Sequence, residues 1–295
     1  AGEAIKGGIP TIPEFFSEAT ARAIRNEYGL AQLVVGTNVL AHASDVLDFI
    51  RAATALLDGD GIFVIEAPYL RDLVESVAYD TIYHEHVSYL SVTALSRILP
   101  LGGLTLTYVE RTPVHGGSIR FIGRPGAAVA DESVDRFLAE EATLGYADGS
   151  ALDGFAERVD ELRGSLANVV RSEVASGRSV AAYGATAKGN TLLTTCDIEP
   201  QSIRYIVDRN PLKQGRLTPG THIPVVGPER LAQDHVDVLL LLAWNLADEI
   251  IKQERQFDRR GGRFLIPIPK PHFADKTTRA RVSRDLVAQD RDVAP

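Results

Sequence analysis

Residues 179–193, SVAAYGATAKGNTLL, place an apolar run, a glycine turn and a helical pattern in direct succession. The run Val180–Tyr183 predicts a buried strand, Gly184 permits a tight turn, and residues 188–195 fit a helix. The same alternation continues toward the end of the chain, with strands expected at 203–207, at Val225 and its neighbour, at 236–242 and at 263–267, and helices at 228–233, 245–260 and 276–290. This order predicts a doubly wound α/β domain over residues 179–295.

The front of the chain repeats the order of strand, helix and strand. A short β-branched run, Leu33–Val35, precedes an amphipathic helix at 44–58. After a turn at 58–61, residues 62–66 form a near-continuous apolar run, as a parallel strand buried on both faces requires. Helices are also expected at 20–28, 70–79 and 92–99, and antiparallel strands at 104–110 and 118–122. The pattern predicts an α/β region over residues 1–127.

The middle of the chain, residues 128–178, differs from both flanking regions. It is rich in Ala, Glu, Leu, Arg and Asp and carries little strand signal. Helices are expected at 131–145 and 152–176, with a glycine-rich break between them. This stretch therefore predicts a helical connector between the two α/β regions.

Composition and charge exclude several classes of protein. The chain has 295 residues, of which 45% are apolar and 24% charged, as is typical of a globular protein. A net charge of −8 argues against nucleic acid as the main partner. No apolar run reaches the roughly 18 residues of a membrane span, and no signal peptide opens the chain, so a cytoplasmic location is expected. The single cysteine, Cys196, argues against a disulfide framework and a cysteine-built zinc site within these residues.

Polar residues at the end of the first predicted strand form one candidate site. Thr37 and Asn38 follow the run Leu33–Val35, and His42 lies just beyond them. Ligands of open α/β sheets bind at the carboxyl ends of the strands. These side chains therefore either contact a ligand or only cap and turn the chain.

The second candidate is the run from Asp80 through Tyr83, His84 and Glu85 to His86. Imidazole is the side chain that changes charge nearest to neutral pH, and a neighbouring carboxylate can orient it. A phenol can donate a hydrogen bond to an oxygen that gains negative charge. The run suits removal of a proton beside a carbonyl group, whereas a metal site lacks a third ligand at recognisable spacing. A solvated polar helix end is the alternative interpretation.

The third candidate is the turn that follows Val180–Tyr183. Gly184 and Gly189 have the spacing of the start of a phosphate-binding loop, but Asn190 and Thr191 replace the Lys-Ser/Thr pair. A G-x-G-x-x-G fingerprint is also absent from this turn. The free N–H groups of the helix start either bind an anion or belong to nothing more than a tight turn.

Three smaller features complete the candidates. The segment His115–Ser118 either lets a ligand approach the backbone or forms a hairpin turn. Trp244 ends the most apolar strand, where it either faces a cleft or closes the core. A basic cluster follows another strand and fits either a phosphate group or a solvated surface: Arg209, Lys213, Gln214 and Arg216.

Six segments, taken together and in order, resemble the sugar-nucleotide C-methyltransferases of deoxysugar and antibiotic biosynthesis. They are TNVLAH (37–42), YHEH (83–86), PVHGGSIR (113–120), AAYGATAKGNTLL (181–193), TPGTHIPV (218–225) and AWNLADEI (243–250). The resemblance implies an S-adenosylmethionine-dependent enzyme that methylates a carbon, typically C-3, beside the ketone of a dTDP-linked 4-keto-deoxysugar. It also implies the last part of a class I methyltransferase domain over residues 1–127 and a Rossmann-like domain over 179–295 that helps to bind the nucleotide sugar.

Members of the resembled family begin with a zinc-binding domain and a glycine-rich cofactor loop, for which this chain shows no counterpart. The chain also lacks methionine altogether. We therefore expect that Ala1 is not the natural start and that zinc belongs only to a part of the protein in front of it.

The resemblance implies roles for individual side chains. His86 corresponds to the general base that removes the sugar proton, and Glu85 orients it or acts beside it. Tyr83 and His42 correspond to groups that position the sugar or stabilise the enolate oxygen, and no metal is needed for this step. Cofactor contacts are implied for Glu14, Phe15, Thr37 and Asn38, and nucleotide-sugar contacts for His115, Gly117, Ser118, Tyr183, Lys188, Asn190, Lys213 and Trp244.

Two other functions stay open. A non-catalytic nucleotide-sugar binding protein would use residues 179–295 alone. An NAD(P)-dependent sugar oxidoreductase fits the α/β pattern but lacks the G-x-G-x-x-G fingerprint. Binding of S-adenosylhomocysteine, dTDP or NADH would distinguish the three functions.

Overall fold

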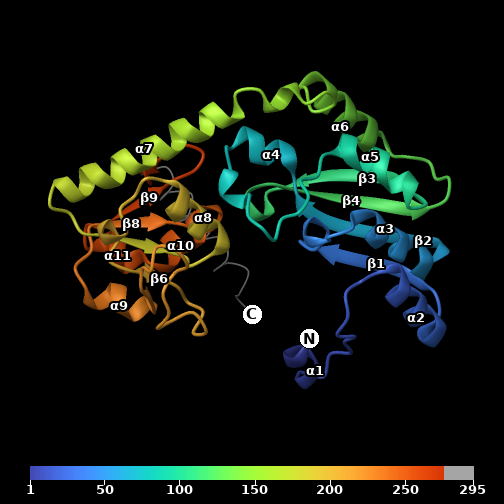
Figure 1. Ribbon diagram of the computed structural model, residues 1–295, viewed down its shortest axis with the longest axis horizontal. Coiled ribbons are helices and arrows are strands. Elements are labelled where there is room, and N and C mark those ends of the chain that lie inside the picture. The colour runs from blue at the N-terminus through green and yellow to red at the C-terminus, as the bar shows by residue number, and fades with distance from the viewer. Residues whose placement is uncertain (276–295) are drawn as a thin grey trace, which may run out of the picture. The chain divides into compact units, whose positions relative to one another are not determined.

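The computed structural model describes residues 1–275, in which the chain forms two compact units (Figure 1). The units are residues 1–72 with 85–152, and residues 73–84 with the described chain from 153 onward. The change to the second unit at Leu152 thus falls inside the stretch predicted to be a helical connector. The helix predicted at 276–290 lies outside the described residues.

The first unit is built on a mixed four-stranded sheet with the order β1-β2-β4-β3. Its strands are β1 (Ala31–Thr37), β2 (Leu57–Pro68), β3 (Leu104–Thr112) and β4 (Ser118–Pro125). β1 and β2 run parallel, and β3 and β4 form the predicted antiparallel pair. The register passes from Ala31 opposite Leu57 to Leu33 opposite Ile62, so the turn expected at 58–61 is instead an irregularity inside β2.

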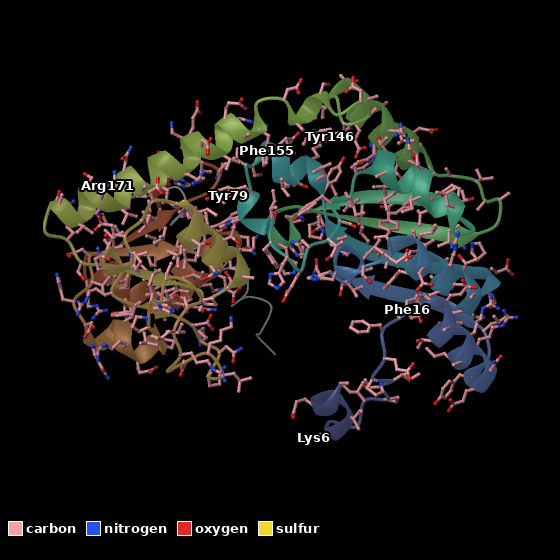
Figure 2. The ribbon with its side chains drawn as sticks, in the orientation of Figure 1. Lys6, Phe16, Tyr79, Tyr146, Phe155 and Arg171 are labelled. Atoms are coloured by element: carbon pink, nitrogen blue, oxygen red, sulfur yellow. The ribbon has the colours of Figure 1, made fainter. Side chains whose placement is uncertain are left out.

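The longer helices of the first unit follow the predicted apolar spacing, whereas the short helix α1 was not predicted and buries no residue. They are α1 (Gly2–Lys6), α2 (Glu18–Tyr28), α3 (Val46–Leu56), α5 (Val92–Leu101) and α6 (Glu132–Thr143), with one-turn helices η1 (Leu40–His42), η3 (Val114–Gly116) and η4 (Ser150–Leu152). Ile50 of α3 and Leu95 of α5 are fully buried in one core with Phe63 and Phe121 of the sheet. Phe16, labelled in Figure 2, packs edge-on against Phe49 of α3. Because each longer helix buries one apolar face, periodicity was sufficient to predict it.

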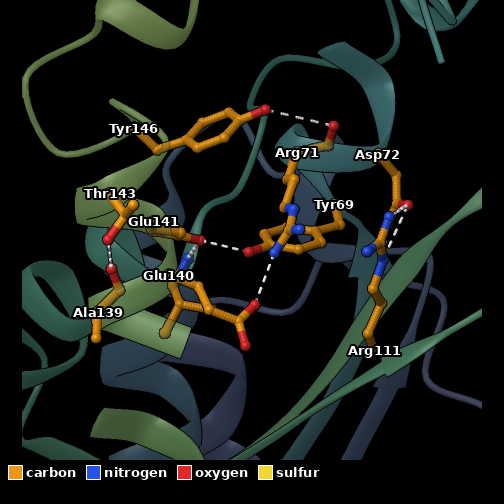
Figure 3. Close-up of polar contacts among 10 residues, drawn as sticks. Tyr69, Arg71, Asp72, Arg111, Ala139, Glu140, Glu141, Thr143 and Tyr146 are labelled. Carbon is orange, nitrogen blue, oxygen red and sulfur yellow. Dashed lines mark hydrogen bonds and ion pairs between the residues drawn. The ribbon is translucent and has the colours of Figure 1, made fainter. Parts of the chain in front are cut away.

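A buried carboxylate organises the end of β2 and the start of α5 (Figure 3). Glu141 of α6 is fully buried and accepts a hydrogen bond from the Tyr69 hydroxyl at 2.8 Å. The backbone N–H groups of Val92 and Thr93 each donate to Glu141 at 2.7 Å, which satisfies the free amides of the α5 N-terminus. Burial and the Glu141 carboxylate raise the pKa of Tyr69, so its hydroxyl stays a donor. These bonds fix the chain just before α4 (Leu70–Glu75).

The second unit is the predicted doubly wound α/β fold. Its six-stranded sheet has the order β10-β9-β8-β5-β6-β7 and is parallel except for β10. The strands are β5 (Val180–Tyr183), β6 (Ile206–Val207), β7 (Val225–Val226), β8 (Val238–Leu241), β9 (Arg263–Ile266) and β10 (His272–Phe273). The helices are α7 (Phe155–Ala175), α8 (Ala187–Thr195), α9 (Pro228–Gln233), α10 (Ala247–Gln253) and α11 (Arg255–Arg259), with one-turn helices η5 (Pro200–Ser202) and η6 (Trp244–Leu246). β5 lies between β6 and β8, so the winding reverses beside β5, where such folds form ligand crevices.

In the second unit, one predicted helix is broken and one predicted strand is reduced to two residues. The helix expected at 245–260 is broken at Glu254, whose backbone is not helical, into α10 and α11. The strand expected at 203–207 has ladder hydrogen bonding only at Ile206–Val207. The short strand concerns element ends, which side-chain patterns define poorly, whereas the break at Glu254 lies in the middle of the predicted helix.

Residues 73–84 belong to the second unit although the chain on either side belongs to the first. The helix predicted at 70–79 ends at Glu75, and a one-turn helix, η2 (Tyr79–Thr81), follows. The Tyr79 side chain (Figure 2) joins the hydrophobic core of the second unit, and its hydroxyl lies 3.0 Å from Thr195 Oγ1. A contact of this kind between distant segments has no periodic signal in the sequence.

Candidate active site

A cavity of about 520 Å³ lies in the second unit, beside the start of α8 and the loop between β6 and β7. Its lining residues come from three segments of the chain: Tyr83 and His84; Ala185, Thr186, Ala187, Asn190 and Thr191; and Lys213, Arg216, Leu217, Thr218, Pro219 and Val225. This volume is in the range of small-molecule sites. The structure therefore brings half of the YHEH run, the glycine turn and the basic loop together in one cavity.

The glycine turn packs α8 tightly against β8. Gly184 has a φ of +97°, and a Cβ there would lie 2.8 Å from the Cβ of Ala243. A Cβ on Gly189 would lie 2.7 Å from the Cβ of Leu242. Thr186 caps the helix by accepting a hydrogen bond from the Gly189 N–H at 3.0 Å. The two glycines thus serve a tight strand–helix turn, and the N-terminal end of α8 lines the cavity.

The two cations of the cavity have different surroundings. Lys213 Nζ donates to the Ala185 carbonyl at 2.8 Å and pairs with Asp208 at 3.2 Å. Asp208 also accepts a hydrogen bond from the Ala185 N–H at 2.8 Å, so the lysine closes a small network at the end of β5. Arg216 is exposed and has no ion-pair partner among residues 1–275. It is therefore the cation best placed to meet an anionic ligand.

Lys188 and Trp244 do not line the cavity. The Lys188 ammonium lies 4.6 Å from the centre of the Trp244 ring, which is cation–π geometry. The Trp244 Nε1–H donates to Asp80 Oδ2 at 2.7 Å. These three side chains occupy the carboxyl ends of β5 and β8, where the winding of the sheet reverses.

Tyr183 is also outside the cavity. As the last residue of β5 it is buried in the core, and its hydroxyl donates to Glu254 at 3.2 Å. Burial and the Glu254 carboxylate raise its pKa to about 12.

In the first unit, the structure brings together two histidines that are distant in sequence. The rings of His42 and His86 are edge to face, with their centroids 4.9 Å apart. The backbone N–H groups of Val87 and Ser88 donate to the Ala41 carbonyl at 2.8 and 3.2 Å, which holds this segment against η1. The first and second sequence candidates thus meet at one place.

The end of β1 carries the polar residues expected there. Asn38 adopts a left-handed φ of +52°, and its N–H donates to the Glu66 carbonyl at 2.8 Å. Thr37 is exposed, as are Glu14 and Phe15, the latter by 95%. An exposed aromatic ring and polar strand-end groups are of the kind that could hold the adenine and the polar parts of S-adenosylmethionine.

The tetrapeptide YHEH divides between the two units. Tyr83 and His84 belong to the second unit and line its cavity, whereas Glu85 and His86 belong to the first. His86 and Tyr83 are half-buried, and Glu85 is exposed.

The segment His115–Ser118 connects β3 and β4 in the first unit. His115 is exposed with a φ of +57°, and the buried Ser118 hydroxyl donates to the Val114 carbonyl at 3.0 Å. A Cβ on Gly117 would lie 2.1 Å from Asp72, which itself pairs with Arg111 (Figure 3). Gly117 is therefore needed for a close approach within the protein itself.

Two residues of interest belong to candidate segments, but the sequence assigns neither of them an individual role. Asp80 opens the second candidate run, and the available signal was an acidic residue directly after the apolar run Val77–Tyr79. Arg216 was noted only as a member of a basic cluster. Its distinction from Lys213 depends on Asp208 and could not be read from the sequence.

Within residues 1–275, no three His, Cys, Asp or Glu side chains gather in a way that could hold a metal ion. In the same part of the chain, no helix combines the length and the apolar character that crossing a membrane requires.

Comparison with known proteins gives three findings. The model of the C-methyltransferase C-terminal domain matches residues 113–269. The C-methyltransferase NovU of Streptomyces niveus is 41% identical over 273 residues, and the match covers 92% of this chain and 65% of that protein. An O-methyltransferase family protein from Burkholderia thailandensis has a TM-score of 0.31 and 15% identity over 43% of this chain and 39% of its own, which is too low to indicate a shared fold. The family model covers more than half of the chain and agrees with the resemblance of the six sequence segments, so this chain belongs to the C-methyltransferase family.

Proposed function

We propose that this protein transfers a methyl group from S-adenosylmethionine to a carbon, C-3, beside the ketone of a dTDP-linked 4-keto-deoxysugar. The observation that carries the proposal is the His42–His86 pair, which lies in the unit that also presents Thr37 and Asn38 at a strand end. Family membership supports the methyl transfer, and the cavity beside α8 supports a nucleotide-sized ligand.

His86 is the proposed general base. A hydrogen beside a ketone is weakly acidic, so its removal needs a base close to the carbon and a donor close to the oxygen. In its neutral form the imidazole accepts the proton on a ring nitrogen, and the His42 ring packs against it. Glu85 stands next to it in the chain to orient or balance the imidazolium that forms, and the Tyr83 phenol is the proposed donor to the enolate oxygen.

S-adenosylmethionine, when bound, supplies an electrophilic methyl group for the carbon that His86 has deprotonated. Asn38 and Thr37 are the proposed contacts for its polar end, and Phe15 with Glu14 for its adenine side. The chemistry of these groups fits, because an exposed ring can stack on a base and a strand end offers amide and hydroxyl groups. Holding donor and acceptor together contributes roughly 7–11 kcal/mol to lowering the barrier.

The cavity of the second unit is the proposed site of the nucleotide diphosphate. The N-terminus of α8 and the Arg216 guanidinium both favour an anion there. Asn190 and Lys213 line the same cavity and are proposed as further contacts. Lys188, Tyr183 and Trp244 then support the strand ends next to the cavity, and His115, Gly117 and Ser118 are proposed to shape the first unit for the sugar.

Calorimetry and product analysis together test the proposal. We expect S-adenosylhomocysteine and dTDP to bind, and mass spectrometry to find one added methyl group on a dTDP-4-keto-deoxysugar incubated with S-adenosylmethionine. Binding of dTDP without methyl transfer would favour a non-catalytic nucleotide-sugar binding protein. Binding of NADH would overturn the proposal in favour of an oxidoreductase.

A further inference from the structure

A buried carboxylate connects residues 73–84 to the centre of the second sheet. Asp80 is 0% exposed and accepts the hydrogen bond from the Trp244 indole through Oδ2. Its other oxygen, Oδ1, is buried and has no hydrogen-bond partner among the described residues. Lys188 lies over the indole ring, so the Trp244 side chain has a carboxylate at its edge and a cation over its face.

Burial of the Asp80 carboxylate lowers the free energy of unfolding. Burial raises the pKa of Asp80 to about 6, although Lys188, the indole and backbone N–H groups act in the opposite direction. An asparagine of the same shape would accept the same indole hydrogen bond without the cost of burying a charge. A group that costs stability and has an altered pKa is a candidate for a role in function.

The anchored segment leads directly to the residues of the candidate site. Val77 has a φ of +53°, which is strained for a β-branched residue, and is held by the core that also takes in Tyr79. Two residues after η2, Tyr83 and His84 line the cavity, and His86 follows within the same run. The bond between Asp80 and Trp244 therefore holds the chain three residues before Tyr83.

We propose that Asp80 is a positioning residue: its bond to Trp244 fixes residues 73–84 within the second unit, and so holds Tyr83 and His84 in the cavity wall. The effect on turnover rests on the proposed function, whereas the bond itself and its effect on the cavity do not.

The anchor is sensitive to pH. The groups that face Asp80 are Lys188 from α8, Cys196 at the end of α8 and Tyr79 from its own segment. Among these, Lys188 favours the ionised form of Asp80. Below about pH 6 the carboxylate takes up a proton, loses its attraction to Lys188 and becomes a weaker acceptor for the indole. We therefore expect the indole hydrogen bond to become weaker without being lost as the pH falls through this value, while removal of the buried charge stabilises the fold as a whole.

Trp244 is the only tryptophan of the chain, so its indole N–H gives one side-chain signal in a nitrogen–proton NMR spectrum. We expect this signal to shift with pH with a midpoint near 6 in the unmodified protein and to be constant in Asp80→Asn. His84→Asn is the matched control, because it removes the nearby imidazole of the cavity wall and should leave the shift in place. A signal that is constant from pH 4.5 to 8 in the unmodified protein, or that still titrates in Asp80→Asn, would overturn the proposal.

Binding and kinetics test the positioning role. We expect Asp80→Ala and Trp244→Phe each to weaken dTDP binding about tenfold and to lower kcat about 30-fold, and the double variant to lose no more than the worse single one. Asp80→Asn, which retains the acceptor, should restore most of both losses at pH 7. Losses that multiply in the double variant, or dTDP binding that is unchanged in Asp80→Ala, would contradict positioning through the Trp244 bond.

Failure of the proposed function would be visible separately. If the unmodified protein transfers no methyl group, the proposed reaction is wrong, while dTDP affinity and the indole signal still decide the role of Asp80. If Asp80→Ala does not fold, the NMR titration of the unmodified protein and of Asp80→Asn decides it alone.

Discussion

The parallel pairs β1–β2 and β5–β8 arise from the same sequence pattern but differ in how accessible the carboxyl ends of their strands are. Among residues 1–275, β1 has a strand on one side only, and its Leu33 and Val35 side chains are 53% and 58% exposed. β5 lies inside its sheet, and all four of its residues are buried. At the carboxyl end of β1 the polar residues are accessible, whereas the ends of β5 and β8 are closed by Asp80, Lys188 and Trp244.

This difference refines the rule that ligands bind at the carboxyl ends of parallel strands. In the second unit the crevice beside β5 is filled by the protein's own side chains, and the cavity is displaced toward β6 and β7. In the first unit the strand end itself carries the candidate polar residues, and the same unit holds the His42–His86 pair. The first unit is therefore best tested by measurements of catalysis, and the second unit by measurements of binding and stability.

The largest effect on turnover is expected from His86→Asn in the first unit, where the carboxyl end of β1 is accessible. Removal of a general base lowers turnover by roughly 10²–10⁴-fold. The measurement is exchange of the C-3 hydrogen of a dTDP-4-keto-deoxysugar with deuterated water, which follows the base without requiring the methyl donor. His235→Asn is the control, because its side chain is 85% exposed and pairs only with Asp237 among the described ion pairs. Normal exchange in His86→Asn would exclude His86 as the base.

One glycine near each strand tests whether the two strand ends differ in how tightly they are packed. Gly184→Ala combines a φ of +97° with a clash against the Ala243 backbone and Cβ, so a loss of about 3 kcal/mol of unfolding free energy is expected. Gly36→Ala in β1 meets only the ends of the Ile65 and Val39 side chains, which can move, and should lose about 1 kcal/mol. Chemical denaturation measures both, and equal losses would contradict the difference in packing.

Burial of Asp80 at the ends of β5 and β8 predicts that the stability of the protein depends on pH. Because the pKa of Asp80 rises from 3.8 to about 6 on folding, the native state holds a proton that the unfolded state has lost between these values. The protein therefore loses stability as the pH rises through this interval, and Asp80→Asn does not. At 1.36 kcal/mol for each pKa unit, the variant should gain up to about 3 kcal/mol relative to the unmodified protein between pH 4 and pH 7. A difference in stability that is constant over this range would show that Asp80 is not desolvated.

The fold was predictable where one residue pattern determines one element. The buried run Val180–Tyr183 and the amphipathic helices were found because apolar spacing reports burial. The bond from Asp80 to Trp244 was not predictable, because it joins positions 164 residues apart and depends on residues 73–84 packing with the second unit. The His42–His86 contact was missed for the same reason, although each histidine was a candidate by itself.

The smallest effect is expected from substitution of the cations that line the cavity of the second unit. Arg216→Gln removes the guanidinium that has no ion-pair partner among residues 1–275, and should weaken dTDP binding about tenfold, as expected for one charge-assisted hydrogen bond. Lys213→Gln should weaken it less, because Asp208 already balances much of that charge. Arg209→Gln is the matched control, since its guanidinium donates to Gln253 at 2.9 Å and does not line the cavity.

The dependence on salt makes this last prediction specific to charge. In calorimetric titrations, the dTDP affinities of the unmodified protein and of Arg216→Gln should differ at low ionic strength and become similar at high ionic strength. The reason is that salt screens an exposed cation far more than a buried one. If Lys213→Gln instead has the larger effect, the ligand must displace Asp208 from the lysine, and the network at the end of β5 would open on binding. The contacts of Lys213 at the end of β5 would then be a state that a ligand can change rather than a fixed feature of the second unit.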